Sequence, residues 1–237
     1  MSELPPLREF PIFAALDDAT LRRLACEAKL ETFADGEAIF RQGDAASAVM
    51  LVVSGFVKLL RTSASGDETV ICIKCDRASI AEAPTSTRET CHMSAEAVGP
   101  TTVLKIPAGK FRGLMADQPA LMAAALDEAK RAVAELVSEI ESLKSHGADQ
   151  RLARFLLSLC PEADQHRFRL PYDKRLIAAQ LGVTQETLSR AFARLREFGV
   201  RTETRDVFLE SAVRLRAQYR DLERPADGAG PRNSEDG

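Results

Sequence analysis

Residues 170–200, LPYDKRLIAAQLGVTQETLSRAFARLREFGV, decide the fold of this 237-residue chain. The apolar side chains recur at intervals of three and four residues, which is the pattern of a buried face on an α-helix. The two inward stripes are Ile177 with Leu181, and Leu188 with Phe192 and Leu195. Gly182 supplies a turn between the stripes, and the small side chain of Ala178 lets the two elements approach closely. The segment therefore predicts two short helices joined at a sharp turn.

The second helix of this pair carries a polar face. Glu186, Ser189 and Arg190 are three and four residues apart, so they share one side of the helix and can reach base edges in a single docking. Thr184 is placed to cap the helix, and Glu186 in the first turn suits the positive end of the helix dipole. An ordinary helical hairpin with a solvated charged face is the alternative. The coincidence of glycine, apolar stripes and polar trio favours a sequence-specific DNA-binding helix-turn-helix.

The charge of the chain is divided unevenly. Residues 147–220 hold 14 Lys and Arg against 9 Asp and Glu, a balance of +5. The rest of the chain holds 18 against 26, or −8, and together the two parts give the net −3. The C-terminal part would attract phosphates while the N-terminal part would not, which indicates a modular organisation.

A long helix is predicted over residues 118–146. Apolar residues alternate there at intervals of four and three over three heptads, which forms a narrow seam that prefers an identical partner helix. The seam consists of Met122, Leu126, Ala129, Val133, Leu136, Ile140 and Leu143. A long helix buried against its own domain is the alternative. A two-fold homodimer would match a palindromic operator, with one recognition helix for each half-site.

Residues 31–107 show the pattern of short β-strands separated by turns. The turns DGE at 35–37, QGD at 42–44, SGF at 54–56 and SGD at 65–67 separate short runs such as Val49–Val53 and Val57–Leu60. Glycine about every ten residues between β-branched segments predicts a small antiparallel barrel or roll.

The remaining segments complete the predicted organisation. Gly147–Asp149 is expected to be a hinge, Arg151–Cys160 a helix, Val200–Leu209 a β-wing and Ser211–Tyr219 a short closing helix. Arg201 and Arg205 of the wing are expected to lie near DNA phosphates. The predicted domains are 1–117 for sensing, 118–146 for dimerisation and 147–220 for DNA binding, with a disordered polar tail at 221–237.

Composition predicts a cytoplasmic protein. The chain is 45% hydrophobic and 28% charged, it lacks a run of eighteen apolar residues, and its N-terminus does not resemble a secretory signal. Five cysteines at irregular spacing indicate free thiols in a reducing compartment. The phosphate-binding glycine loop, GxSxG and HExxH are all missing from the sequence, so we expect no enzyme.

The segment TQETLSRAFARL resembles the recognition helix of the CRP/FNR family of bacterial transcription regulators. Glu-x-x-Ser-Arg resembles the FNR-type subgroup, which reads TTGAT separated by four bases from ATCAA. The resemblance implies that Arg190 contacts guanine, Glu186 the cytosine amino group and Ser189 a thymine. Gln185 stands where another part of the family carries arginine, which argues against TGTGA-type sites. The implied partners are double-stranded DNA, a second copy of the chain and, for an activator, RNA polymerase.

The run FRQGDAASAVMLVVSGFVKLL resembles the effector domain of the same family, a cyclic-nucleotide-binding-type β-roll. The implied fold is α+β: an antiparallel β-roll, a long dimerisation helix and a C-terminal winged helix-turn-helix. The expected effector pocket includes Glu82, Cys91, His92 and Met93. Arginine is missing where cyclic-AMP binders clamp the phosphate, so cyclic AMP is not expected. Cys26 is the only cysteine before residue 70, which argues against an iron–sulfur cluster.

The segments LPYDKRLIAAQLG and SAEAVGPTTVLKIPAGKF look most like the DNR and NnrR branch, regulators of denitrification that respond to nitric oxide through haem. Candidate haem ligands cluster in ETCHMS, near Cys72 and Cys75. Alternation along a strand would turn Cys91 and Met93 inward and His92 away. Small core fillers are the plainer interpretation of these cysteines and methionine.

Two alternatives to haem sensing stay open. Cys75 lies between Lys74 and Arg77, whose charges would stabilise a thiolate and allow a thiol redox switch. The other is a signalling adaptor with a cyclic-nucleotide-binding fold, whose C-terminal helices bind protein and not DNA. The basic C-terminal part and the Glu186, Ser189 and Arg190 trio argue against the adaptor.

Overall fold

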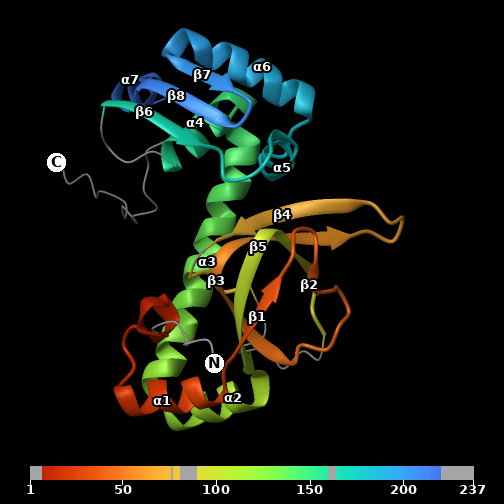
Figure 1. Ribbon diagram of the computed structural model, residues 1–237, viewed down its shortest axis with the longest axis vertical. Coiled ribbons are helices and arrows are strands. Elements are labelled where there is room, and N and C mark those ends of the chain that lie inside the picture. The colour runs from red at the N-terminus through yellow and green to blue at the C-terminus, as the bar shows by residue number, and fades with distance from the viewer. Residues whose placement is uncertain (1–6, 76, 81–89, 160–163, 220–237) are drawn as a thin grey trace, which may run out of the picture. The chain divides into compact units, whose positions relative to one another are not determined.

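The computed structural model describes residues 7–75, 77–80, 90–159 and 164–219 (Figure 1). The chain forms two compact units, residues 1–132 and 133–237. The boundary between the two units, at residues 132 and 133, falls inside the long helix. The predicted domain boundaries lie at the two ends of that helix, at residues 118 and 146. The predicted pocket residue Glu82 and the predicted tail 221–237 lie outside the described residues.

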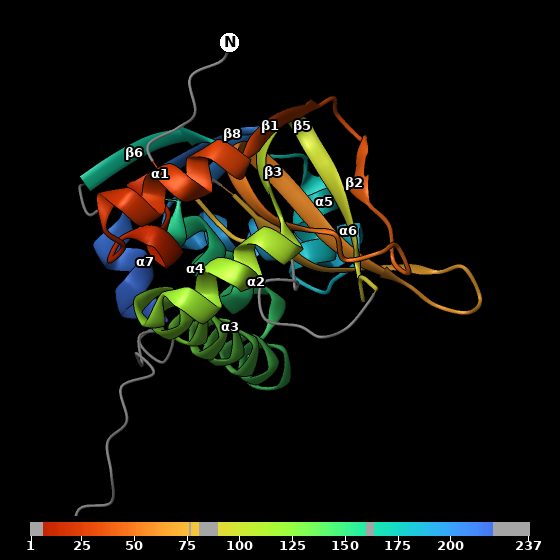
Figure 2. The ribbon, with the colours of Figure 1, turned by 90° about the horizontal axis from the view of Figure 1, so that it is seen from below.

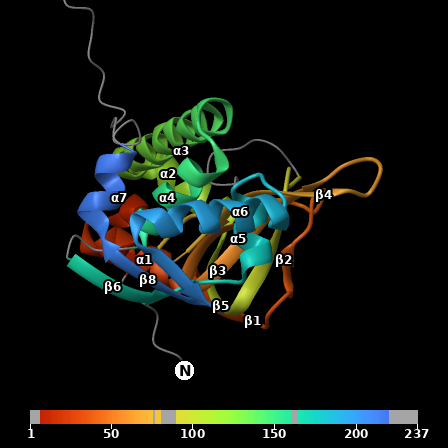
Figure 3. The ribbon, with the colours of Figure 1, turned by 90° about the horizontal axis from the view of Figure 1, so that it is seen from above.

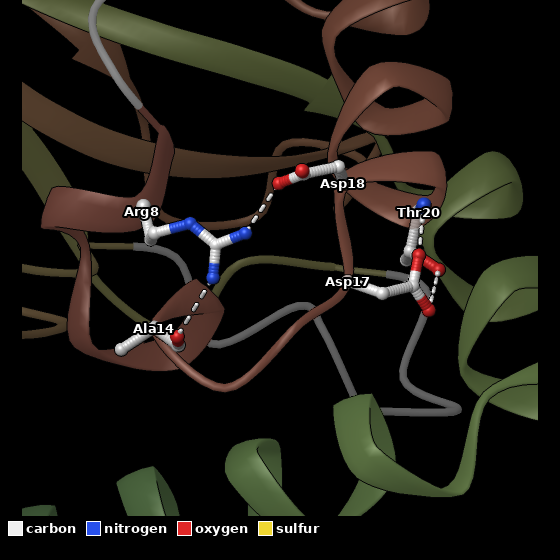
Figure 4. A network of polar contacts seen from close by, with 5 residues as sticks. All are labelled: Arg8, Ala14, Asp17, Asp18 and Thr20. Carbon is white, nitrogen blue, oxygen red and sulfur yellow. Dashed lines mark hydrogen bonds and ion pairs between the residues drawn. The ribbon is translucent and has the colours of Figure 1, made fainter.

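The first unit opens with short helices. The 3₁₀ turns η1 (Leu7–Glu9) and η2 (Pro11–Phe13) precede α1 (Asp18–Glu27). Asp17 caps α1: its carboxylate accepts from the Thr20 backbone N–H at 2.7 Å, and this hydrogen bond is the largest cause of the lowered pKa of Asp17 (Figure 4). The neighbouring Asp18 pairs with Arg8 at 2.5 Å. These carboxylates therefore fix the start of a helix.

The antiparallel β-roll is confirmed. Its strands are β1 (Lys29–Phe33), β2 (Ala38–Phe40), β3 (Ala48–Thr62), β4 (Glu68–Lys74) and β5 (Ser94–Pro107). The order is β1-β5-β3-β4, and β2 also pairs with β5. The predicted turns at Gly36, Gly43 and Gly66 have positive φ. An apolar cluster that includes Met50, Val52, Val57 and Ala95 fills one part of the roll.

The expected turn at residues 54–56 is wrong, because β3 runs straight through it. Gly55 adopts φ +92° at a bulge where the pairing of β3 with β5 shifts register. A Cβ at Gly55 would lie 2.6 Å from the Pro100 carbonyl oxygen and 2.7 Å from the Thr101 hydroxyl. The sequence correctly indicated a glycine with unusual backbone geometry at this position, but Gly55 allows β3 and β5 to approach closely and does not form a turn.

Gly55→Ala is expected to destabilise the roll by roughly 2–5 kcal/mol, from backbone strain at positive φ and from the clash with β5. Gly36→Ala is the matched control: φ is +76°, and among the described residues no neighbouring atom would lie within 4 Å of an added Cβ. That control should lose only the strain contribution, about 1–2 kcal/mol. Equilibrium urea unfolding of both variants measures the difference, and equal losses would show that close packing at Gly55 is unimportant.

Two helices follow the roll. In α2 (Ala108–Asp117), Phe111, Leu114 and Met115 pack into a core shared with Phe13 and Leu24. The helices α1 and α2 contact each other beside this core (Figure 2). The long helix α3 (Pro119–Ser145) agrees closely with the predicted 118–146. It contributes Leu121 and Ala125 to the same core.

The second unit is a winged helix-turn-helix. Its elements are α4 (Ala148–Ser158), β6 (Asp164–Arg169), α5 (Lys174–Gln180), α6 (Gln185–Leu195), η3 (Arg196–Phe198), β7 (Val200–Glu203), β8 (Asp206–Ser211) and α7 (Ala212–Gln218). The sheet order is β6-β8-β7, and α6 contacts both α4 and α5 (Figure 3). The predicted wing and closing helix are confirmed.

Two details of the second unit differ from the prediction. The hinge is shorter than Gly147–Asp149, because α4 begins at Ala148 with Gly147 as its N-cap. Residues 164–169, for which the sequence predicted no helix or strand, form β6 and pair with β8. Among the described residues, no helix has both the length and the apolar character needed to cross a membrane.

Candidate DNA-binding site

The helix-turn-helix is built from α5, the turn at Gly182 and α6. Asp173 caps α5, and the Thr184 hydroxyl caps α6 by accepting from the Thr187 backbone N–H at 3.2 Å. Gly182 has φ +63°, the left-handed geometry that glycine adopts without strain. The predicted inward residues are all buried: Ile177, Ala178, Leu181, Leu188, Phe192 and Leu195. Packing of these side chains leaves the opposite face of α6 turned outward.

The outer face of α6 carries the predicted polar trio. Glu186, Ser189 and Arg190 are exposed, as are Thr184 and Gln185 at the start of the helix. The side chains of Arg190 and Glu186 are 70% and 75% exposed, and they form an ion pair one helical turn apart. An exposed ion pair of this kind contributes at most about 1 kcal/mol, so either side chain can leave it for a base edge at little cost in free energy. The outer face of α6 therefore presents a guanidinium donor, a carboxylate acceptor and a hydroxyl side by side.

Lys174 supports the recognition helix in a way that sequence reasoning missed. Its ammonium lies 5.1 Å from the centre of the Phe192 ring on α6 and 3.4 Å from the Thr202 hydroxyl on β7. One side chain of α5 thus touches both the recognition helix and the wing. The only signal in the sequence was the helical start DKR, which does not specify these partners.

The two predicted wing arginines differ in their surroundings. Arg201 is 75% exposed, and its ion pair with Glu210 at 3.1 Å lies on the surface, so it remains a candidate for phosphate contact. The Arg205 guanidinium instead donates to the backbone carbonyls of Leu170 and Pro171, at 2.9 and 2.6 Å. We therefore correct the assignment of Arg205: it ties the wing turn to the segment before α5.

A half-buried polar contact closes the domain behind α6. The Tyr219 hydroxyl, after α7, donates to the Asp149 carboxylate at 3.3 Å, and Asp149 also lies 3.8 Å from Arg194 of α6. Burial, followed by the charge of Asp149, raises the pKa of Tyr219 to about 12. Tyr219 therefore stays neutral at physiological pH and holds α7 to the start of α4.

The candidate effector residues lie at the edge of the roll. Residues Cys91–Met93 precede β5, which begins at Ser94, so the predicted strand alternation does not extend to Cys91. Met93 and Cys72 nevertheless pack against the apolar cluster of the roll. Cys75 is exposed after β4, but the guanidinium of Arg77 pairs with Glu9 at 2.8 Å. One of the two cations expected to stabilise a Cys75 thiolate is thus engaged elsewhere.

Among the described residues, no three His, Cys, Asp or Glu side chains gather closely enough to hold a metal ion. A haem iron differs from such a site, because it needs only one or two protein ligands in an apolar setting. The thioether of Met93 and the thiol of Cys72, both beside the apolar cluster, fit that donor chemistry.

Comparison with known proteins agrees with this architecture. Residues 30–118 match the cyclic nucleotide-binding domain and residues 150–218 match the Crp-like helix-turn-helix domain. The transcriptional activator protein anr of Pseudomonas aeruginosa is 28% identical over 186 residues, 76% of each chain.

Two solved structures cover most of the chain. A cyclic nucleotide binding protein of Ruegeria pomeroyi is 33% identical, with a TM-score of 0.67 over 90% of this chain and 95% of that one. DNR from Pseudomonas aeruginosa is 28% identical, with a TM-score of 0.50 over 89% and 95%. The chain therefore belongs to the CRP/FNR family of DNA-binding transcriptional regulators, with a cyclic-nucleotide-binding-type β-roll and a Crp-like helix-turn-helix.

Proposed function

We propose that the protein is a homodimeric regulator that binds an FNR-type palindrome, TTGAT and ATCAA separated by four bases. The observation that carries this proposal is the joint exposure of Glu186, Ser189 and Arg190 on the outer face of α6. An activating dimer would also contact RNA polymerase in the cytoplasm.

Each member of the trio has a base partner in this proposal. The Arg190 guanidinium donates to guanine O6 and N7, the Glu186 carboxylate accepts from the cytosine amino group, and Ser189 contacts a thymine. Because Glu186 and Arg190 already pair on the free helix, their side chains lie side by side before DNA arrives. Arg201 would add a phosphate contact that is independent of sequence.

The seam of α3 supports the homodimer. The six large apolar residues of the seam are between 47% and 60% exposed, and Ala129 is exposed as well. Such a continuous apolar line is costly in water, and its heptad spacing suits a second copy of the same helix. The alternative of burial against the chain's own domain leaves these exposures unexplained. A neighbouring strip of the same helix, through Leu121 and Ala125, supplies the internal packing.

A mobility shift with the full chain tests the DNA proposal. The palindromic duplex is expected to bind at least about 1,000-fold more tightly than a scrambled duplex of equal length, as is usual for specific over non-specific binding. The salt concentration must be fixed, because phosphate contacts weaken as salt rises. Equal affinity for both duplexes would instead favour a protein-binding adaptor.

For the effector we propose nitric oxide, sensed through a haem bound at the edge of the β-roll. Two observations support this choice: the likeness to DNR, and the placement of Met93 and Cys72 beside the apolar cluster. Bound there, haem would supply an iron centre that takes up nitric oxide. The protein's own contribution is a thioether or thiol ligand and an apolar surround that limits access of water.

Iron-supplied protein is expected to show a Soret band that shifts when nitric oxide is added. Met93→Leu, which keeps the volume but removes the donor sulfur, should move or abolish that band. Cys26→Ser, at an exposed position of α1, should leave it unchanged. Absorption spectra of the three purified proteins make the comparison. A wild-type protein without a Soret band would refute haem sensing and leave the Cys75 thiol switch as the alternative to test.

A further inference from the structure

Arg151, a half-buried residue of α4, bonds to the ends of two other helices at once. Its Nη1 donates to the carbonyl oxygen of His146, directly after α3, at 2.7 Å. Its Nε donates to the carbonyl oxygen of Leu181, the C-cap of α5, at 3.0 Å. Leu181 immediately precedes the Gly182 turn, so a single guanidinium joins the end of the seam helix to the helix-turn-helix.

The chemistry of helix ends explains why an arginine suits this position. The last carbonyls of a helix lack intrahelical donors, and they form the negative end of the helix dipole. A guanidinium presents N–H groups in two fixed directions, whereas the ammonium of lysine is a compact point charge. Arg151 can therefore hold two helix ends at a set separation, which lysine cannot reproduce.

A second contact joins the same parts. A Cβ at Gly182 would lie 3.1 Å from Cδ2 of Leu143, so the turn of the helix-turn-helix lies against the last seam residue of α3. Arg154, one turn further along α4, donates to the Ser138 hydroxyl of α3, at 3.1 Å. Among the residues that the structure describes, Arg154 thus bonds to α3 and not to the turn, whereas Arg151 bonds both to the end of α3 and to Leu181 before the turn.

We propose that Arg151 is a positioning residue that fixes the orientation of α6 relative to the C-terminal end of α3. The inference rests on the proposed homodimer: when two α3 helices pair, that orientation sets the distance between the two recognition helices. Arg151 then determines which half-site spacing the dimer prefers, although it touches no base. Loss of the two Arg151 hydrogen bonds should reduce the preference for one half-site spacing more than it lowers the stability of the fold.

The test compares Arg151→Lys with Arg154→Lys in the full chain. Each protein is titrated with the four-base-spacer palindrome and with duplexes whose spacer is one base shorter or longer. We expect Arg151→Lys to lose about tenfold in affinity for the four-base spacer and to discriminate several-fold less among the three spacers. Arg154→Lys should keep the wild-type spacer preference. A merely structural role would weaken all three duplexes alike and lower the thermal unfolding midpoint.

Hydrogen exchange of the DNA-free proteins gives a readout that does not depend on the operator. Backbone amides around Gly182 and His146 should exchange several-fold faster in Arg151→Lys and at the wild-type rate in Arg154→Lys. Unchanged exchange in both variants, or an unchanged spacer preference in Arg151→Lys, would overturn the inference. If the wild-type protein fails to bind any of the duplexes, the proposed operator fails, and the exchange experiment still decides whether Arg151 couples the two helix ends.

Discussion

Leu136→Glu is expected to convert the protein from a dimer to a monomer and to lower its affinity for the palindrome by at least about 100-fold, because two linked half-site contacts become one. Leu136 lies in the middle of the α3 seam and is 51% exposed. In the proposed dimer it packs against its counterpart, where two buried carboxylates would repel each other and lose hydration. Sedimentation and duplex titration measure the two effects.

Val213→Glu provides the matched control for the oligomeric state. Val213 is a large apolar residue on α7 with 65% exposure, but it lies outside the seam. Both variants place a carboxylate at an exposed apolar position, and only the seam variant should dissociate. A Leu136→Glu protein that sediments as a dimer would show that the seam is not the interface.

Arg190→Ala is expected to lose about 1–3 kcal/mol at each half-site, a decrease of roughly 5- to 150-fold, because guanine loses its bidentate donor. Affinity for scrambled DNA should change little. Truncation also frees Glu186 from its ion pair on α6, which adds a small exposed-pair contribution at most. Titration of both duplexes at one salt concentration separates specific from general losses.

Arg201→Ala is the contrasting variant. Its guanidinium is as exposed as that of Arg190 but lies on the wing, where we expect a phosphate contact. Cognate and scrambled duplexes should weaken together, and the dependence of affinity on salt should become shallower. Equal losses on both duplexes for Arg190→Ala would remove Arg190 from the base-reading role.

Local patterns in the sequence predicted the helical half of the site well. The inward stripes, the Thr184 cap and the Gly182 turn depend on residues within a few positions of one another, and the structure confirms each of them. The long helix is confirmed for the same reason, since its heptad pattern is sustained over many turns. The exposed trio follows directly, because burial of one helix face determines which face remains outside.

Contacts between distant segments could not be predicted in this way. Residues 164–169 became a strand because β8, some forty residues later, provides backbone partners for it. Gly55 reads as a turn glycine until β5 is seen to pass close to it. The sequence predicted no partner for Arg151 and a phosphate contact for Arg205, and only the folded chain brings backbone carbonyl groups to both. Spacing alone carries no information about such partners.

Replacing the half-site guanine with 7-deazaguanine tests most directly whether α6 reads DNA through Arg190. The substitution removes the N7 acceptor and leaves the base pair intact. Wild-type protein should lose affinity for the modified duplex, whereas Arg190→Ala, which has already lost the contact, should bind modified and natural duplexes equally. If the modification instead weakens both proteins by the same factor, Arg190 does not contact that guanine, and the proposed recognition by α6 is contradicted.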